Sequence, residues 1–235
     1  MQVCVLGPGR LGRSLAVLLP AAGVRTHLWR RGEPLPVPGF LPDLYWLAVR
    51  DDALAAVAAL LPRDCVVLHA SGALGADVLG HPLGGVLHPL MTFPGPEVGL
   101  PSLDGVGARI DGCPEARVAA RALAQVLGMV PVEGVDPVAW HAAASMVSGH
   151  LAALYLDAAT VLERAGLDNA REILLPLALE SLRRAASVGP AAITGPAARG
   201  DEGTVALHRQ LLGEELQAYD ALDARIRAMR REIRR

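Results

Sequence analysis

The sequence predicts an α/β protein, in which an N-terminal, doubly wound parallel sheet is followed by an all-α C-terminal domain. Short β-rich runs alternate with Ala/Leu-rich helical stretches over the first 135 residues. A glycine turn follows the first of these runs. Strand signals then stop, and long helical stretches take their place. We therefore expect two domains, residues 1–135 and residues 136–235.

The expected elements lie between the Gly, Pro and charged residues that interrupt the apolar runs. The strands expected in the first domain are 3–6, 24–29, 44–49, 65–69, 85–88, 106–110 and 129–132. The helices expected between them are 13–22, 51–61 and 115–127. Those of the second domain are 138–165, 169–188 and 201–235, the last as one helix or a bent pair with a solvated, Arg-rich end at 225–235. Right-handed crossovers are expected to place the carboxyl ends of all strands along one edge of the sheet.

Composition excludes several classes of protein. Hydrophobic residues make up 52% of the 235 residues, which allows a core, and a charged fraction of 20% excludes a disordered chain. Aromatic residues are only 3%, so the core must consist of Ala, Leu and Val. A net charge of −2 argues against a nucleic-acid partner. The apolar stretches contain Arg, Asp, Pro or His before they reach the ~20 residues of a membrane span, so no membrane partner is expected.

Cysteine usage and the first residues indicate a reducing cytoplasm. Cys4, Cys65 and Cys113 are scattered and odd in number, so neither a disulfide framework nor a zinc site is expected. No group of residues has metal-ligand spacing, and we expect no metal. The N-terminus lacks the basic start and cleavage site of a signal peptide.

The glycine turn has the pattern of a dinucleotide-binding loop. It consists of Gly7, Pro8, Gly9, Arg10, Leu11 and Gly12, which fit G-x-G-x-x-G. The first glycine permits a tight turn, the second lets the backbone approach a pyrophosphate, and the third lets strand and helix pack closely. The N-terminus of the following helix points its free N–H groups at the phosphates. A purely structural glycine turn is the alternative.

The end of the second strand favours NADP over NAD. NAD-binding folds usually place an acidic residue there, about 20 residues after the glycines, to hold the ribose hydroxyls. Arg30 and Arg31 occupy this place. Two guanidiniums suit a 2′-phosphate by charge and geometry, and one of them could stack on the adenine. A solubilising surface pair is the alternative.

Four further segments resemble motifs of known enzymes. The segment 46–52, with Val49 before Asp51 and Asp52, resembles the third-strand motif of the β-hydroxyacid dehydrogenase and pyrroline-5-carboxylate reductase superfamily. The segments His69-Ala70-Ser71-Gly72, Leu87-His88-Pro89-Leu90-Met91-Thr92-Phe93 and Thr194-Gly195-Pro196-Ala197-Ala198-Arg199-Gly200-Asp201, the last followed by His208 and Tyr219, are similar to those of one narrower family.

Members of that family pair a Rossmann-like N-terminal domain with a C-terminal helical domain of unknown function. They are usually described as NADP oxidoreductases. The resemblance covers nearly the whole chain, and it implies the fold and NADP as cofactor. We expect Val49 in the cofactor site, and Ser71, which follows the fourth strand, near the nicotinamide half of the cofactor. The resemblance implies no particular substrate.

The sequence departs from the superfamily where catalysis is concerned. The superfamily commonly uses a Lys and an Asn on the first long helix of the C-terminal domain. All basic residues other than His are Arg in this chain, and the one Asn, Asn169, lies elsewhere. No mechanism that needs a lysine can operate.

Histidines are the candidates to replace the lysine. His141, Ser145 and Ser148 are spaced i, i+4, i+7 and would share one face of a helix. His141 could donate a proton as hydride arrives from the nicotinamide, and the two serines could orient the substrate. The alternative is a core histidine with two serines bonded to the helix backbone.

His88 is the second candidate. It ends the fifth strand, where ligands bind in such sheets, and Pro89 restricts its backbone. It could contact the substrate or the nicotinamide, or it could bond a loop carbonyl. His69, His81 and His150 are expected to be structural.

The loop 194–201 supplies a candidate substrate contact. Arg199 could bind a substrate carboxylate, or it could pair with Asp201 or Glu202. Asp201 is placed to cap the helix that follows.

These residues predict an NADP(H)-dependent oxidoreductase. It would reduce a C=O or C=N bond of a small, carboxylated substrate by hydride transfer, with a His in place of the superfamily's Lys. The alternative is a non-catalytic NADP-binding protein whose helical domain serves assembly. Convergence of His88 and His141 would favour the enzyme. The helix 138–165 is apolar on more than one face, so we expect a homodimer through the C-terminal helices.

Overall fold

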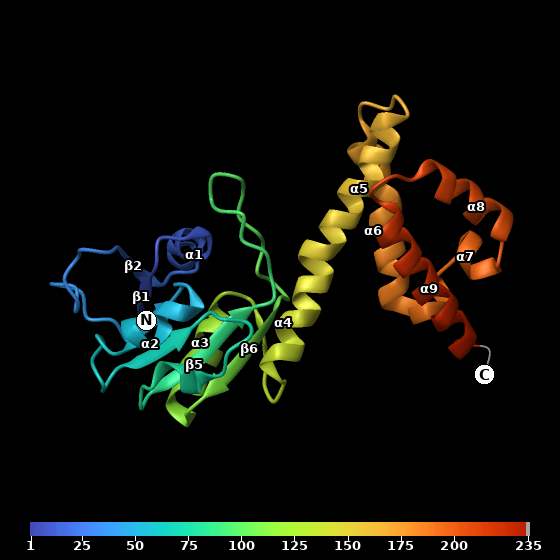
Figure 1. The fold of residues 1–235 in the computed structure, drawn as a ribbon. Coiled ribbons are helices and arrows are strands. Elements are labelled where there is room, and N and C mark those ends of the chain that lie inside the picture. The colour runs from blue at the N-terminus through green and yellow to red at the C-terminus, as the bar shows by residue number, and fades with distance from the viewer. Residues whose placement is uncertain (234–235) are drawn as a thin grey trace. The chain divides into compact units, whose positions relative to one another are not determined.

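The computed structural model describes residues 1–233, and its chain forms two compact units, Met1–Met146 and Val147–Arg235. The first unit holds a seven-stranded sheet with its helices, and the second is helical (Figure 1). The boundary expected from the sequence near residue 135 lies just before α4 (Pro137–Ser145). That helix belongs to the unit that contains the sheet.

The sheet has the strand order β2-β1-β3-β4-β5-β6-β7. Its strands are β1 (Gln2–Leu6), β2 (Arg25–Trp29), β3 (Leu44–Leu47), β4 (Val66–His69), β5 (Gly84–Pro89), β6 (Gly107–Gly112) and β7 (Val130–Val132). Neighbouring strands are parallel except β5 and β6, which are antiparallel. The expectation that all carboxyl ends share one edge is therefore wrong for β6. A parallel neighbour needs a crossover, usually a helix, whereas residues 90–106 form a loop without a helix.

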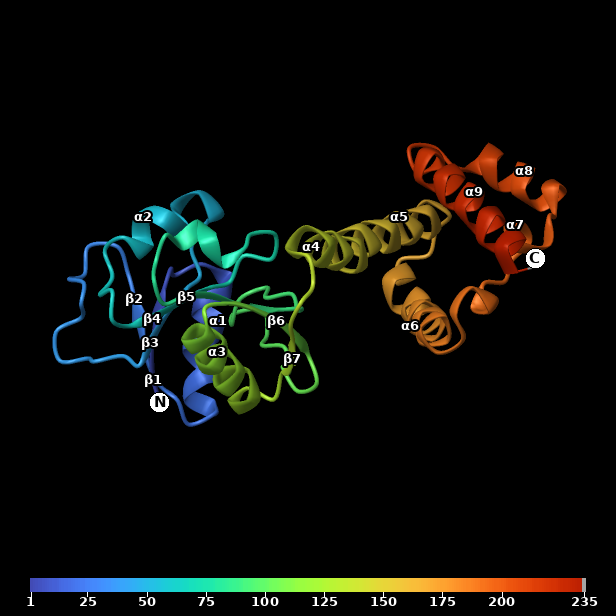
Figure 2. The same cartoon turned by 90° about the horizontal axis from the view of Figure 1, so that it is seen from below.

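The helices of the first unit cover both faces of the sheet. α1 (Arg10–Ala21) and α3 (Pro114–Val126) pack on one face, and α2 (Leu54–Ala58) packs on the other (Figure 2). Successive residues of a strand point to opposite faces, so Val3 and Val5 pack with α1 and α3 while Cys4 and Leu6 pack with α2. This arrangement confirms the doubly wound fold.

The glycine turn joins β1 to α1 at close quarters. Gly7 has a φ of +116°, and a Cβ atom on it would lie 2.5 Å from the Ala48 carbonyl oxygen. A Cβ atom on Gly12 would lie 1.8 Å from the Gly7 carbonyl oxygen. α1 begins directly after Gly9, three residues earlier than expected, because the helix uses this tight turn as its start.

The second unit consists of helices. They are α5 (Leu151–Arg164), α6 (Ala170–Val188), α7 (Pro196–Arg199), α8 (Glu202–Leu211) and α9 (Leu216–Ile233). The helix expected over 138–165 is interrupted by a π-helical turn at Met146–His150. The expected bent pair after residue 201 is α8 and α9, and residues 234–235 of the Arg-rich end lie outside the described residues. Asp201 caps α8 as expected, because its Oδ1 accepts a hydrogen bond from Thr204 N at 3.1 Å.

The helical unit buries little apolar surface. Its buried apolar residues among those described are Ala159, Ala170, Ala198 and Val205. The two large core clusters consist of residues of the first unit. Ion pairs such as Arg164–Glu215, at 2.8 Å, link helices of the second unit at its surface. Large apolar residues on α6 stay exposed, among them Leu177 at 66%.

One helical run is apolar enough to cross a membrane by length and composition alone. It is Pro137–Arg164, which comprises α4, the π-helical turn and α5. Only 6% of its most apolar window is buried. A single helix of this kind is weak evidence for a membrane span, because helices of proteins outside membranes pass the same test.

The glycine turn generates a stability prediction. Gly12→Ala should lower the free energy of unfolding by at least about 2 kcal/mol, because its Cβ has no room beside the Gly7 carbonyl. Gly9→Ala should cost no more than about 1 kcal/mol, since a Cβ there meets no atom within 4 Å and φ is −69°. Urea denaturation of the two variants checks this, and equal losses would contradict it.

Candidate functional site

The glycine turn lies where the strand order reverses direction. β2 lies on one side of β1 and β3 on the other, so the carboxyl ends of β1 and β3 flank the crevice in which such sheets bind ligands. Gly9 is exposed at the N-terminus of α1, and open space surrounds its Cβ position. Val49, after β3, lies against the turn, with Cγ1 3.1 Å from the Cβ position of Gly7. The turn can therefore accept a phosphate at the positive end of the α1 dipole.

The other members of the turn differ in exposure. The side chains of Pro8 and Arg10 are exposed, while Leu11 packs partly buried against the core. Arg13, one helical turn further on, forms a two-pronged ion pair with Glu97 at 2.9 and 3.0 Å. This pair ties the loop 90–106 to α1.

The structure places Arg30 and Arg31 directly after β2, and both side chains are exposed. The loop that carries them is held by Glu33, whose carboxylate lies 3.0 Å from His27 Nε2 and whose carbonyl accepts from Trp29 Nε1 at 3.1 Å. The hydrogen bond with His27 lowers the pKa of Glu33. Neither arginine forms an ion pair within residues 1–233, so both guanidiniums can bind a phosphate.

His88 and His141 converge beside Gly72. Their ring centroids are 6.3 Å apart, and the rings are nearly perpendicular. A Cβ atom on Gly72 would lie 2.5 Å from His141 Cδ2 and 2.9 Å from His88 Nε2. The lack of a side chain at Gly72 thus lets both rings reach this point. Trp140, next to His141 on α4, donates from Nε1 to His88 Nδ1 at 2.9 Å.

The two histidines differ in environment. His88 is partly buried, and this burial, followed by the charges of Arg109 and His141, lowers its pKa from 6.5 to about 4. His141 is exposed. The site therefore pairs a histidine whose neutral form is favoured with one whose side chain is open to water.

Arg109 is a site residue that the sequence analysis missed. It lies on β6 directly opposite His88 on β5, and its side chain is 1% exposed. Its Nη2 donates to the carbonyl of Leu74 at 2.6 Å and to that of Ser71 at 3.4 Å. An arginine inside the apolar strand 106–110 was the signal available, because isolated charges are rarely buried without a role.

The expected structural histidines bond the backbone. His69 Nδ1 accepts from Ser71 N–H, and its Nε2 lies 3.0 Å from the Gly75 carbonyl. His81 bridges Leu83 N–H and the Pro62 carbonyl in the same way. The Ser71 hydroxyl donates to Asp51 at 3.0 Å, so it ties the turn after β4 to the turn after β3.

The structure does not support a continuous stripe of His141, Ser145 and Ser148. Ser145 donates to the His141 carbonyl at 2.9 Å, which is the backbone bond of the alternative interpretation. The π-helical turn at Met146–His150 follows, and its wider winding breaks the i, i+4, i+7 register before Ser148. Ser148 and exposed His150 fall in the helical unit.

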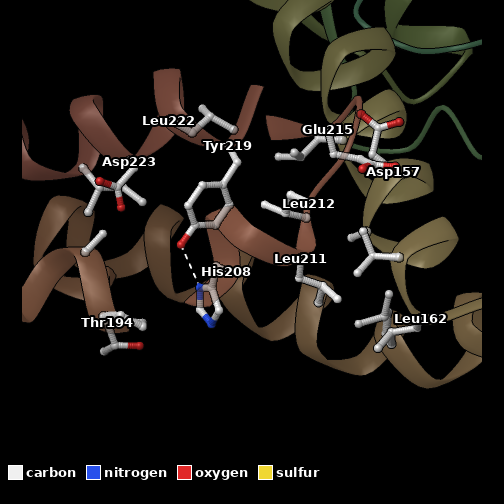
Figure 3. A pocket seen from close by; sticks show the side chains of 17 residues that line it. Asp157, Leu162, Thr194, His208, Leu211, Leu212, Glu215, Tyr219, Leu222 and Asp223 are labelled. Atoms are coloured by element: carbon white, nitrogen blue, oxygen red, sulfur yellow. Dashed lines mark hydrogen bonds between the residues drawn. The ribbon is translucent and has the colours of Figure 1, made fainter. Parts of the chain in front are cut away.

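The helical unit holds Arg199 and an apolar cavity. Arg199 ends α7 and is exposed. The cavity has a volume of about 560 Å³ and a lining of leucines from α5, α6, α8 and α9, including Leu162, Leu211 and Leu222 (Figure 3). Polar residues line it too, and two of them, His208 and Tyr219, are joined by a hydrogen bond between His208 Nδ1 and Tyr219 Oη at 2.8 Å. Burial raises the pKa of Tyr219.

A family model matches just over half of the chain. The family described as "Domain of unknown function (DUF2520)" matches residues 107–226. The chain belongs to this family. Among curated proteins, none matches the sequence.

Several solved structures share the fold over nearly the whole chain. A protein of Bacteroides fragilis named "putative NADP oxidoreductase BF3122" has a TM-score of 0.81 at 20% identity, over 97% of this chain and 98% of that one. Protein TM1727 of Thermotoga maritima has a TM-score of 0.72 at 19% identity, over 99% and 100%. Pyrroline carboxylate reductase of Plasmodium falciparum, solved with NADP bound, has a TM-score of 0.61 at 11% identity, over 97% and 98%. At these identities the likeness shows a common fold.

Metal ligands do not gather in the described part of the chain. Residues 1–233 contain no group of three or more His, Cys, Asp or Glu side chains that could hold a metal ion.

The lowered pKa of His88 predicts a dependence of stability on pH. Between pH 6.5 and about 4 the unfolded chain protonates this histidine and the folded chain does not. The free energy of unfolding is therefore highest above this window and falls as the pH falls through it. His88→Gln should make this fall in the free energy of unfolding smaller, by an amount on the order of 1–3 kcal/mol. Denaturation at about pH 7 and about pH 5 measures it, and an equal decline in both proteins would contradict it.

Proposed function

We propose that the protein is an NADP(H)-dependent oxidoreductase that reduces a C=O or C=N bond of a small, carboxylated substrate. The observation that carries the proposal is the convergence of His88 and His141 at Gly72. Gly72 follows β4, and only β3 separates β4 from β1, which precedes the glycine turn. A dinucleotide turn and proton-carrying side chains in one α/β unit are the parts that hydride transfer requires.

NADP is supported by the fit of the residues to it. The open space at Gly9 is the approach that a pyrophosphate needs, and Gly12 allows the close helix packing of such turns. The exposed Arg30 and Arg31, directly after β2, offer two guanidiniums that suit the charge and geometry of a 2′-phosphate. The names of the two similar structures that mention NADP support the same cofactor.

The chain's own residues divide the chemistry between them. When bound, the cofactor supplies a hydride to the carbon of the C=O or C=N bond. His141, as imidazolium, releases its proton to the oxygen or nitrogen of that bond and is recharged from water, because its side chain is exposed. His88 contacts the same atom from the sheet and orients it. Ser145 holds the His141 carbonyl.

A non-catalytic NADP-binding protein is the alternative. The absence of lysine from the whole sequence favours it, because the superfamily that the motifs resemble commonly uses one. NADPH oxidation with a panel of 2-oxo acids, 3-oxo acids and cyclic imines separates the two. Turnover of any of them supports the enzyme, and NADPH binding without turnover of any supports the alternative.

We also propose that a second copy of the chain covers the helical unit in a homodimer in the cytoplasm. The unit buries only four apolar residues among those described, which is too few to stabilise its helices. The same unit exposes leucines on α6 and a leucine-lined cavity, so two copies can bury each other's apolar surface. The three free cysteines fit a reducing compartment.

The first prediction of this proposal concerns the cofactor. Arg30→Ala with Arg31→Ala should weaken NADPH binding by about 10-fold or more and change NADH binding little, because only NADPH carries the 2′-phosphate. Gly9→Asp should abolish binding of both, since it places a carboxylate where the pyrophosphate approaches. Nicotinamide fluorescence titrations measure both affinities. An equal loss for NADPH and NADH in the double variant would rule out the assignment to NADP.

The second concerns the proton donor. His141→Ala should leave NADPH affinity nearly unchanged and lower kcat by ~10²–10⁴, the usual contribution of a positioned acid. Ser145→Ala should be milder, since its hydroxyl bonds the helix backbone. Steady-state kinetics on a substrate from the panel decide, and wild-type turnover in His141→Ala would exclude this role.

The third concerns assembly. The wild type should scatter light as a particle of twice 24.5 kDa without detergent. Leu177→Glu, on α6, should dissociate or unfold the helical unit. Leu60→Glu is the matched control, because Leu60 is similarly exposed, at 63% against 66%, but lies in the sheet unit. A wild-type mass of 24.5 kDa at micromolar concentration, or solubility only in detergent, would refute the dimer.

A further inference from the structure

The hydrogen bond of Trp140 determines which nitrogen of His88 carries a proton. An indole N–H is a donor only, so His88 Nδ1 must accept, which requires that it carry no proton. The one proton of a neutral imidazole then sits on Nε2. This is the nitrogen that lies 2.9 Å from the Cβ position of Gly72, on the side of the ring where His141 converges.

The charges around His88 oppose a second proton. Arg109 lies opposite it on β6 and is buried, so its charge is poorly screened. His141 on α4 and His69 at the end of β4 also act on His88 and disfavour its cationic form. Asp111 on β6 offsets the charge of Arg109 only weakly, because its carboxylate lies 3.8 Å from Arg109 Nη1 and is half exposed. The cationic form of His88 would also lose the bond from Trp140.

We propose that Trp140 and Arg109 are positioning residues that hold His88 as a neutral imidazole with its proton on Nε2. His88 then donates a hydrogen bond to the reacting carbonyl oxygen and does not release its proton. This assignment deepens the proposed function, on which the identity of the bonded atom rests, and it leaves proton transfer to His141. It also means that the site favours a carbonyl oxygen, because its two lone pairs can accept from His88 and from His141 at once.

Arg109 acts through the backbone as well as through charge. Its guanidinium donates to the carbonyls of Leu74 and Ser71, on either side of Gly72. Arg109 thus anchors the segment around Gly72, which leaves room for the two histidine rings, and it also opposes protonation of His88. Replacement of Arg109 should therefore change both the protonation of His88 and the position of Gly72.

Nitrogen-15 NMR of histidine-labelled, full-length protein tests the proposal without a substrate. His88 is assigned by its absence in His88→Gln. In the wild type it should show the Nε2–H tautomer alone from about pH 8 to about pH 5. Trp140→Phe, at a half-buried position, should make the second tautomer detectable, because Nδ1 loses its donor. Trp29→Phe, which removes an indole bond to Glu33 at a distance from His88, is the control and should leave the His88 signals unchanged.

Arg109→Gln should raise the pKa of His88 by about one pH unit in the same titration, and Arg109→Lys should largely restore it. Should Arg109→Gln not fold, the wild-type and Trp140→Phe spectra still decide. A proton on Nδ1 in the wild type, or a His88 that is cationic near pH 6, would overturn the proposal. The measurement needs neither NADPH nor turnover, so its result is separate from that of the kinetic tests.

Discussion

The buried guanidinium of Arg109 connects the parts of the histidine site. It comes from β6, faces His88 on β5, and bonds the two carbonyls that flank Gly72 after β4. Burial of an arginine is expensive, and its Nε finds no partner within the described residues, so the interactions of the other nitrogens must offset the cost. Three neighbouring strand ends therefore keep their relative positions through one side chain.

That arrangement depends on the direction of β6. β5 and β6 are antiparallel, and their register places His88 directly opposite Arg109. A parallel β6 would follow a different register. The sequence pattern predicts that 106–110 is a strand, but strand direction depends on the path of the loop 90–106, which carries no periodic signal. This is why the glycine turn could be identified from sequence, whereas the pairing of Arg109 with His88 could not.

The limits of local reasoning differ between the two halves of the candidate site. In the glycine turn the three glycines lie within six residues, so each geometric requirement is readable from spacing: the tight φ of Gly7, the open space at Gly9 and the close packing at Gly12. On α4 the spacing of His141 and Ser145 was readable too. The π-helical turn after them was not, because it shifts the register of Ser148 without a distinctive residue pattern.

Two identical side chains acquire different chemistry here from their surroundings. Both His88 and His141 lie at Gly72, but one is packed between Trp140 and a buried cation while the other is open to water. The first environment disfavours the cationic form and fixes one tautomer, and the second leaves the ring in contact with water. A hydrogen-bond donor must keep its proton, whereas an acid must give its proton up. Two histidines at one point can fill both roles when one is buried and the other is exposed. A lysine is then not required for the proton, which is consistent with its absence from the sequence.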